Sequence, residues 1–189
     1  MQRKSESANV LKFYLSQISN YPKTSIIRTD WGGEFVSKEF QDIILNHNIK
    51  HEFSAPYSPH QMGHIERQWR ILFNTTRAIL IDTNVPNLLW PYVVKYAAFL
   101  RNRTYQKRIK CTPLQKATKK IPNMAKVFLF GSKCYVYDQF NTKLEPRALE
   151  GIFIGYDEIS PSILVFDPVT HTVKKSLKVK ILNMIDTLK

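Results

Sequence analysis

Asp30 and Glu66 are the two acidic side chains whose setting in the sequence best suits chemistry on a phosphate ester. Asp30 ends a β-branched segment, residues 23–29, that predicts a strand, and Gly32 and Gly33 after it predict a turn. Glu66 follows a proline-containing loop and lies in the first turn of a predicted helix. Carboxylates at such rigid positions can bind Mg²⁺, and two ions roughly 3.5–4 Å apart stabilise both oxygens of a phosphoryl transfer. The pair therefore makes metal-dependent phosphoryl transfer a candidate function.

Each acid also has an ordinary structural use. An aspartate at a strand end commonly forms a turn, and a glutamate in the first turn of a helix is stabilised by the helix dipole. Residue type and local setting alone therefore do not decide between a catalytic and a structural role for either acid.

Basic residues are in excess and are unevenly distributed. The chain has 28 Lys and Arg against 15 Asp and Glu, and residues 101–120 hold eight basic residues and no acid. Cations of this kind gain affinity for polyanions by releasing counterions, although a solvated surface is the simpler alternative. Arg70 can also pair with Glu66 four residues earlier on the same helix. The candidate contacts to nucleic acid are Arg70, Arg77, Arg101, Arg103, Lys107, Arg108 and Lys110.

Composition excludes several other classes of protein. With 43% hydrophobic residues the chain can form a core, so it is not disordered throughout. Its two cysteines show no CxxC spacing, which argues against a disulfide framework or a zinc knuckle. No segment reaches the roughly 18 apolar residues that a membrane span needs. We therefore expect no membrane among its partners. A small-molecule substrate is not expected either.

The first two thirds of the chain alternate between predicted helices and strands. Helices are expected at residues 7–18, 37–46, 62–81 and 86–105, and strands at 23–29 and 49–54. Ser37 is a candidate N-cap, and apolar stripes on the two long helices place Trp69 and Trp90 in the core. This order predicts an α/β layer architecture.

The last third of the chain changes character. Residues 127–137, 151–156, 162–166 and 173–182 are strand-like runs separated by turn signals, and Asp167-Pro168 predicts a hairpin turn. We therefore predict two domains, an α/β domain at residues 1–124 and a small β-barrel or β-sandwich module at residues 125–189.

Short motifs follow one another in order along nearly the whole chain. They are Arg28-Thr-Asp30-Trp-Gly-Gly-Glu-Phe35, Phe40, the segment from Ile49 to Arg67, Trp90, Asn102-Arg103, Thr112-Pro113-Leu114, Phe130-Gly131, Tyr135-Val136-Tyr137, Lys143-Leu-Glu-Pro-Arg147, Gly151-Ile-Phe-Ile-Gly-Tyr156 and Val165-Phe-Asp-Pro168. Together with the 35 residues between Asp30 and Glu66, this set resembles the integrases of copia-type retrotransposons.

The resemblance implies an RNase H-like, retroviral integrase-type core followed by a small all-β module. It implies that Asp30 and Glu66 are the second and third acids of an Asp, Asp, Glu triad that binds Mg²⁺ or Mn²⁺. The first acid is expected on a strand upstream of Asp30, where only Glu6 is acidic. The core is therefore expected to be incomplete, with metal binding weak or absent unless a third carboxylate is supplied. Trp31 stands where the family usually has Asn, and its bulk could crowd the metal or the DNA.

The resulting hypothesis is a truncated integrase-like protein. The family trims DNA ends and joins them to target DNA, and this chain is expected to bind DNA but to be inactive alone. The alternatives are a non-catalytic DNA- or chromatin-binding remnant and a relic without function. Expected partners are DNA and other integrase or Pol chains, and the expected location is the nucleus, with the cytoplasm as the alternative.

Overall fold

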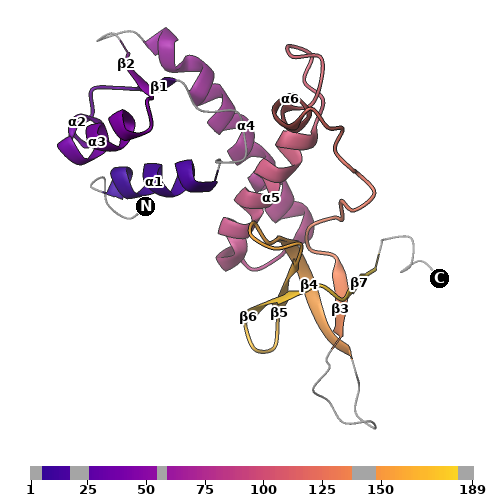
Figure 1. Ribbon diagram of the computed structural model, residues 1–189. Coiled ribbons are helices and arrows are strands. Elements are labelled where there is room, and N and C mark those ends of the chain that lie inside the picture. The colour runs from indigo at the N-terminus through magenta and orange to yellow at the C-terminus, as the bar shows by residue number, and fades with distance from the viewer. Residues whose placement is uncertain (1–5, 18–25, 55–58, 138–147, 183–189) are drawn as a thin grey trace. The chain divides into compact units, whose positions relative to one another are not determined.

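The computed structural model describes residues 6–17, 26–54, 59–137 and 148–182 (Figure 1). The chain divides into two compact units, Met1–Gln68 and Trp69–Lys189, which are described separately below. Residues 23–25 of the first predicted strand, the prolyl loop at 55–58 and the motif at 143–147 lie outside the described residues. Among the described helices, none combines the length and the apolar character that crossing a membrane requires.

The first unit contains a pair of parallel strands with helices packed against it. Strand β1 (Ile26–Thr29) pairs with β2 (Lys50–Phe53), so that Thr29 lies opposite Phe53. Helices α1 (Ser7–Gln17), α2 (Gly33–Val36) and α3 (Lys38–Asn46) accompany them, and the long helix α4 (Pro59–Thr83) begins in this unit. The buried core of the unit consists of Ala8, Leu15, Phe40, Ile44 and Ile49.

Helix α3 shows how local chemistry sets an element boundary. Ser37 precedes the helix, and its Oγ accepts a hydrogen bond of 3.4 Å from the backbone nitrogen of Phe40. A serine in this position satisfies one of the donors that a helix start leaves without a partner. Phe40 and Ile44 then lie four residues apart on the buried face. The predicted cap is confirmed.

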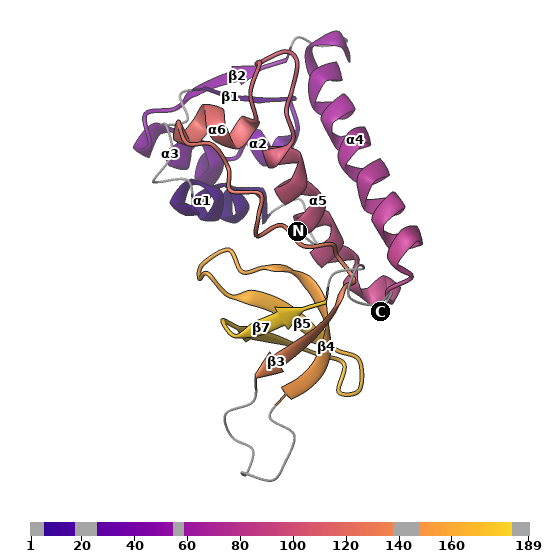
Figure 2. The ribbon, with the colours of Figure 1, turned by 90° about the vertical axis from the view of Figure 1, so that its right-hand side faces the viewer.

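The second unit joins helices to an antiparallel sheet (Figures 1 and 2). After α4 come the 3₁₀ turn η2 (Asn87–Leu89), α5 (Trp90–Arg103) and α6 (Pro113–Thr118). The sheet has the strand order β6-β5-β4-β3-β7. Its strands are β3 (Lys133–Tyr137), β4 (Ala148–Tyr156), β5 (Ile163–Asp167), β6 (Thr172–Ser176) and β7 (Val179–Ile181). The predicted change from helix-rich to strand-rich structure is confirmed.

One core is shared by α5 and this sheet. Leu89, Val93 and Tyr96 belong to the same buried cluster as Phe153 and Phe166, which come from β4 and β5. Helix and sheet therefore stabilise each other by burying apolar surface together. The domain boundary between residues 124 and 125 stays a prediction.

Several expectations from apolar spacing are wrong. Helix α4 begins at Pro59 rather than Met62, which places Glu66 beyond its first turn. Trp69 and Trp90, expected in the core, are 53% and 55% exposed. Thr76, seven residues after Trp69 and on the same face of α4, is buried, and Leu89 at the end of η2 takes the buried place next to Trp90. The apolar stripe on α4 is therefore correct in phase, but the core covers it at Thr76 and Ile79 and not at Trp69.

Candidate functional site

Asp30 lies immediately after β1, at the carboxyl end of the parallel strand pair. Its Oδ1 accepts a 3.2 Å hydrogen bond from the backbone nitrogen of Gly32, which closes the turn that leads into α2. The strand ladder continues beside it, because the backbone nitrogen of Ser54 donates to the carbonyl of Thr29 at 2.8 Å. Asp30 is exposed and is held at the end of a paired strand. This position suits a metal ligand and also suits a turn former.

A chain of hydrogen bonds supports this strand end from inside the unit. Gln41 Nε2 on α3 lies 3.0 Å from His51 Nδ1, and His51 Nε2 lies 2.9 Å from Thr29 Oγ1. Thr29 Oγ1 in turn donates to the carbonyl oxygen of Asp30 at 2.9 Å. Because the amide nitrogen of Gln41 can only donate, we infer that Nδ1 of His51 accepts and Nε2 carries the proton. Burial lowers the pKa of His51, which agrees with a neutral ring.

Gly32 leaves room for two carboxylates. A Cβ atom built on Gly32 would lie 2.9 Å from Glu34 Oε2 and 3.2 Å from Asp30 Oδ1. Both acidic side chains therefore approach the same side of Gly32. Sequence reasoning overlooked Glu34, although the Gly-Gly-Glu spacing directly after Asp30 is a signal that could have found it.

Trp31 lies next to Asp30 and is fixed on two sides. Its ring stacks on Phe53 with a centroid distance of 4.4 Å and an interplanar angle of 18°. Its indole nitrogen donates a 3.0 Å hydrogen bond to the carbonyl of Ser54. The side chain still remains 59% exposed. Trp31, which the sequence marked as a possible obstruction, is therefore an exposed ring that is held against the end of β2.

Glu66 is exposed on α4. Among the ion pairs of the described part of the chain, none joins it to Arg70. Carboxylate oxygens are the donors that a hard cation such as Mg²⁺ prefers. Within the described ranges, however, no group of three or more His, Cys, Asp or Glu side chains is arranged to hold a metal ion. The donor chemistry of Asp30 and Glu66 suits Mg²⁺, but the described residues do not assemble a complete ligand set.

The cationic residues predicted to bind nucleic acid fall into three structural settings. Arg70 and Arg77 are exposed on α4, seven residues apart and therefore on one face of the helix. Arg101 and Arg103 are half-buried in the last turn of α5. The guanidinium of Arg103 lies 3.5 Å from the centroid of the Phe99 ring, and its Nη1 donates to the Phe99 carbonyl at 3.2 Å. Arg103 therefore has a structural role that its sequence position did not indicate.

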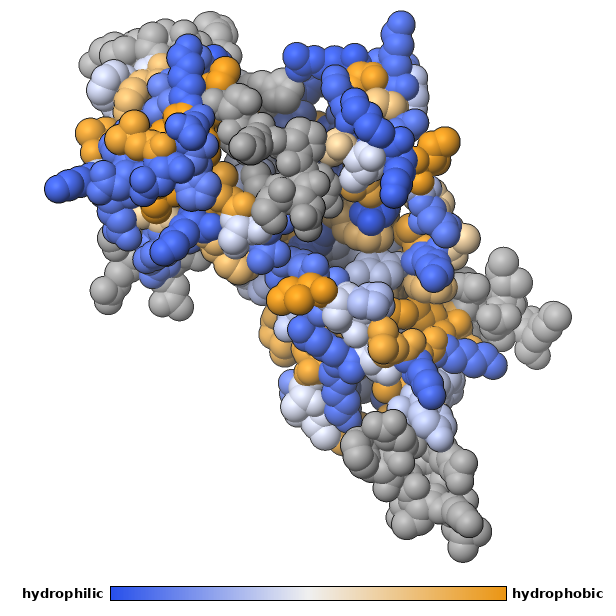
Figure 3. All heavy atoms as spheres, viewed as in Figure 1, coloured by the Kyte–Doolittle hydropathy of each residue, from blue (hydrophilic) through white to orange (hydrophobic). Residues whose placement is uncertain are grey.

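Lys107, Arg108 and Lys110 lie together on an exposed turn. Gln106 and Cys111 form an isolated antiparallel bridge, and the backbone nitrogen of Gln106 donates to the carbonyl of Cys111 at 3.0 Å. The bridge closes the turn that carries the three cations. Helix α6 follows, and hydrophilic side chains predominate over this region in Figure 3. We refer to residues 106–111 as the cationic turn.

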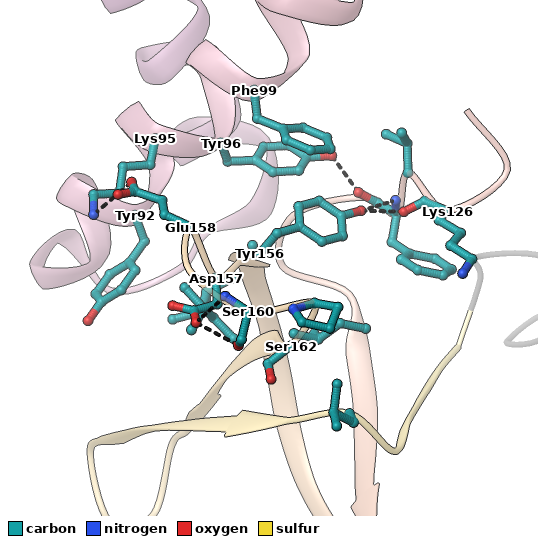
Figure 4. Close-up of a pocket in the computed structure, with 18 of the residues that line it drawn as sticks. Tyr92, Lys95, Tyr96, Phe99, Lys126, Tyr156, Asp157, Glu158, Ser160 and Ser162 are labelled. Atoms are coloured by element: carbon teal, nitrogen blue, oxygen red, sulfur yellow. Dashed lines mark hydrogen bonds and ion pairs between the residues drawn. The ribbon is translucent and has the colours of Figure 1, made fainter. Parts of the chain in front are cut away.

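An open cavity of 630 Å³ lies in the second unit, where α5 and the sheet meet (Figure 4). Tyr96 donates its hydroxyl hydrogen to the carbonyl of Phe128, and Tyr156 donates to the carbonyl of Lys126 at 2.6 Å. Burial raises the pKa of Tyr96 to about 12, so this hydroxyl stays protonated. Lys95 and Glu158 form an ion pair of 3.1 Å at the rim. No sequence signal pointed to this cavity.

At the same rim, Asp157 gives the unit a defined response to acid. Lys175 Nζ lies 2.8 Å from its Oδ1, and Ser160 Oγ donates to its Oδ2 at 2.7 Å. The hydrogen bond from Lys175, followed by that from Ser160, lowers the pKa of Asp157 to about 2 from 3.8. Because the folded state has the lower pKa, the ionised carboxylate stabilises the fold above about pH 4, and this contribution fades as the pH falls through about 2.

We therefore expect Asp157→Asn to destabilise the second unit at neutral pH, by an amount that shrinks as the pH falls from about 5 to 2. Urea denaturation of both proteins across this range measures the difference. Asp82→Asn, at an exposed position on α4, controls for the loss of one negative charge. A difference between wild type and Asp157→Asn that is independent of pH would contradict the assignment.

The chain is similar in sequence to a known protein family and to several known proteins. Residues 132–186 match the family of the retroviral polymerase SH3-like domain. The chain is 29% identical over 157 residues to the retrovirus-related Pol polyprotein from transposon TNT 1-94 of Nicotiana tabacum, covering 82% of this chain and 12% of that protein. It is 31% identical over 161 residues to the retrovirus-related Pol polyprotein from transposon RE2 of Arabidopsis thaliana, covering 82% and 11%. The chain is a homologue of retrovirus-related Pol polyproteins.

The family resemblance deduced from the motifs is thus confirmed. The Pol homologue spans about a tenth of the length of these relatives. Its fold is similar to a chain of the simian T-cell lymphotropic virus intasome in complex with PP2A regulatory subunit B56 gamma. That similarity has a TM-score of 0.52 at 19% identity and covers 96% of this chain and 65% of the other. It concerns the fold alone, and it confirms the predicted α/β class with a small β module.

Proposed function

We propose that the Pol homologue is an integrase-like, DNA-binding protein that contributes Asp30 and Glu66 to a polynucleotidyl transferase site without catalysing DNA joining by itself. The observation that carries the proposal is the position of Asp30. It follows a parallel strand, is braced by the Thr29–His51–Gln41 hydrogen bonds, and is separated by 35 intervening residues from a glutamate on the next long helix. This setting suits a metal ligand better than a loop tip would.

The inactivity of the chain alone is proposed from the incomplete ligand set. Phosphoryl transfer of this kind depends mostly on positioning and on electrostatic stabilisation by bound metal. When Mg²⁺ or Mn²⁺ is bound, it would supply that charge, with Asp30 and Glu66 as its carboxylate ligands from this chain. The described residues offer no group of three ligands, so activity would require a further carboxylate, for example from another Pol chain. A nuclear location follows if chromosomal DNA is the target.

The test is strand transfer, or its reversal, on a branched DNA substrate with the purified 189-residue chain and Mn²⁺. We expect no joining by wild type or by Glu66→Gln, together with DNA binding by both. Joining by wild type that disappears in Glu66→Gln would overturn the proposed inactivity and would establish Glu66 as a catalytic ligand.

A DNA- or chromatin-binding protein without chemistry is the second candidate function, and the cationic turn favours it. Its cations project from a closed turn into solvent, where they can approach phosphates without unfolding anything. Unchanged affinity in Asp30→Asn and Glu66→Gln, in the presence and absence of Mn²⁺, would support this candidate over the first.

We expect DNA binding to weaken steeply with salt, and the cationic turn to supply part of that dependence. Each phosphate contact contributes about −0.9 to the slope of log affinity against log salt for duplex DNA. Replacing Lys107 and Arg108 with glutamine should therefore reduce the magnitude of the slope by about 2. Replacing Lys12 and Lys38, which are exposed on α1 and α3, removes the same charge and serves as the matched control. Equal effects of the two double variants would contradict a specific role for the turn.

A further inference from the structure

Trp31 combines exposure with rigidity, a combination that a stacking surface requires. It is 59% exposed, yet Phe53 lies against its ring and its indole N–H is bound to the carbonyl of Ser54. Most exposed side chains lose rotamer freedom when a ligand binds, and this loss costs affinity. The contacts of Trp31 fix the ring before any ligand arrives, so little of that cost remains.

The support behind Trp31 extends into the unit. Phe53 lies 4.1 Å, centroid to centroid, from the ring of His51, which is held by its hydrogen bonds to Gln41 and Thr29. Trp31, Phe53 and His51 therefore form a row of three rings anchored to β1, β2 and α3. We refer to these three residues as the aromatic row. Trp31, at the outer end of this row, is the residue next to Asp30.

The surroundings of Trp31 indicate what kind of ligand fits it. One charged side chain, Asp30, adjoins it in the chain, whereas the Arg28–Glu52 ion pair of 2.7 Å lies on the same two strands but on the face opposite to Phe53. A protein partner that anchors on tryptophan usually requires a wider apolar patch around the ring. A nucleobase needs only one flat face, and its charged backbone favours a protein with a net charge of +13.

We propose that Trp31 is a positioning residue that stacks on an unpaired base of DNA and thereby holds a strand end beside Asp30. The base must be unpaired because bases inside a duplex already stack on both sides, whereas a frayed or overhanging base has a free face. The inference rests on the proposed DNA-binding function and deepens it. It identifies the substrate feature that the site favours as a single-stranded end.

Fluorescence of Trp31 itself provides the first test. Trp69→Phe with Trp90→Phe leaves Trp31 as the only tryptophan of the 189-residue chain. Titration with a duplex that carries a short single-stranded extension should quench its emission, because a stacked base is in direct contact with the indole. A blunt duplex of the same length should bind without comparable quenching. Equal signals from the two DNAs would overturn the inference.

Affinity measurements on single variants provide the second test. Trp31→Ala should weaken binding of the extended duplex about tenfold, within the range for loss of one base–aromatic stack, and should leave blunt duplex almost unchanged. Trp31→Phe should retain most of the preference. Trp90→Ala, at a similarly exposed tryptophan of the second unit, should have no effect on it. Should Trp31→Ala fail to fold, the fluorescence result decides the question.

The outcomes separate this inference from the function on which it rests. Binding of both DNAs that is insensitive to Trp31→Ala would overturn the stacking role and leave the DNA-binding proposal intact. No binding of either DNA at low salt would overturn both. A tenfold effect confined to the extended duplex supports both.

Discussion

Replacing Phe153 with alanine is expected to lower the free energy of unfolding of the second unit by about 3–5 kcal/mol. Phe153 is 0% exposed and lies at the centre of the core shared by α5 and the sheet. Its ring meets those of Tyr96, Phe128 and Tyr156 in edge-to-face contacts at 5.2–6.1 Å. Removing the ring leaves a cavity and forfeits these contacts together, and domains have only about 5–15 kcal/mol of stability to lose.

Urea denaturation followed by circular dichroism measures this loss. Leu149→Ala is the matched control, because Leu149 lies on the same strand but is 37% exposed, and its replacement should cost less than about 1 kcal/mol. A cost below 1 kcal/mol for Phe153→Ala would mean that α5 and the sheet do not share a packed core. Conversely, Phe153→Leu should recover part of the stability.

Gly151→Ala is expected to destabilise the same unit by about 1–3 kcal/mol through overpacking. A Cβ atom on Gly151 would lie 2.4 Å from Val165 Cγ1 and 3.1 Å from the carbonyl oxygen of Phe166. Both neighbours belong to β5, which pairs with β4 in the middle of the sheet. The backbone oxygen cannot move without disturbing that pairing, so the added methyl group must displace a buried side chain, the strand or both.

A double-mutant cycle identifies the source of the cost. Val165→Ala removes the atom that the new Cβ would meet. The double variant should therefore lose less free energy of unfolding than the two single variants lose in sum, by about 1 kcal/mol or more. Strict additivity in urea denaturation would show that the clash with Val165 is not what makes glycine necessary.

Elements whose boundaries depend on local chemistry could be predicted from the sequence. Ser37 caps α3 as expected, and Asp167 forms the expected hairpin turn, with its Oδ1 accepting from the backbone nitrogens of Val169 and Thr170. These contacts span two or three residues, so the sequence contains both partners side by side. Trp69 and Trp90 were misplaced because an apolar stripe on a helix does not say which of its edges the core covers.

The candidate site was only partly predictable for a similar reason. The prediction that Asp30 follows a strand was correct, because the β-branched run and the Gly-Gly turn are local signals. The bonds that link Thr29, His51 and Gln41 depend on the pairing of β1 with β2 and on the packing of α3. The contact of Trp31 with Phe53 likewise crosses between strands. Spacing along the chain carries no information about such pairs before the register is known.

The cationic turn is closed by its own backbone bridge, and its members are absent from the buried cluster that α5 shares with the sheet. Changes in its length or charge would therefore cost the fold little. A lineage carrying this chain could gain, lose or retune its attraction to a polyanion by substitutions in this turn, while the residues that hold the fold together stayed as they are. Selection can therefore change the affinity for a polyanion without changing the stability of the fold.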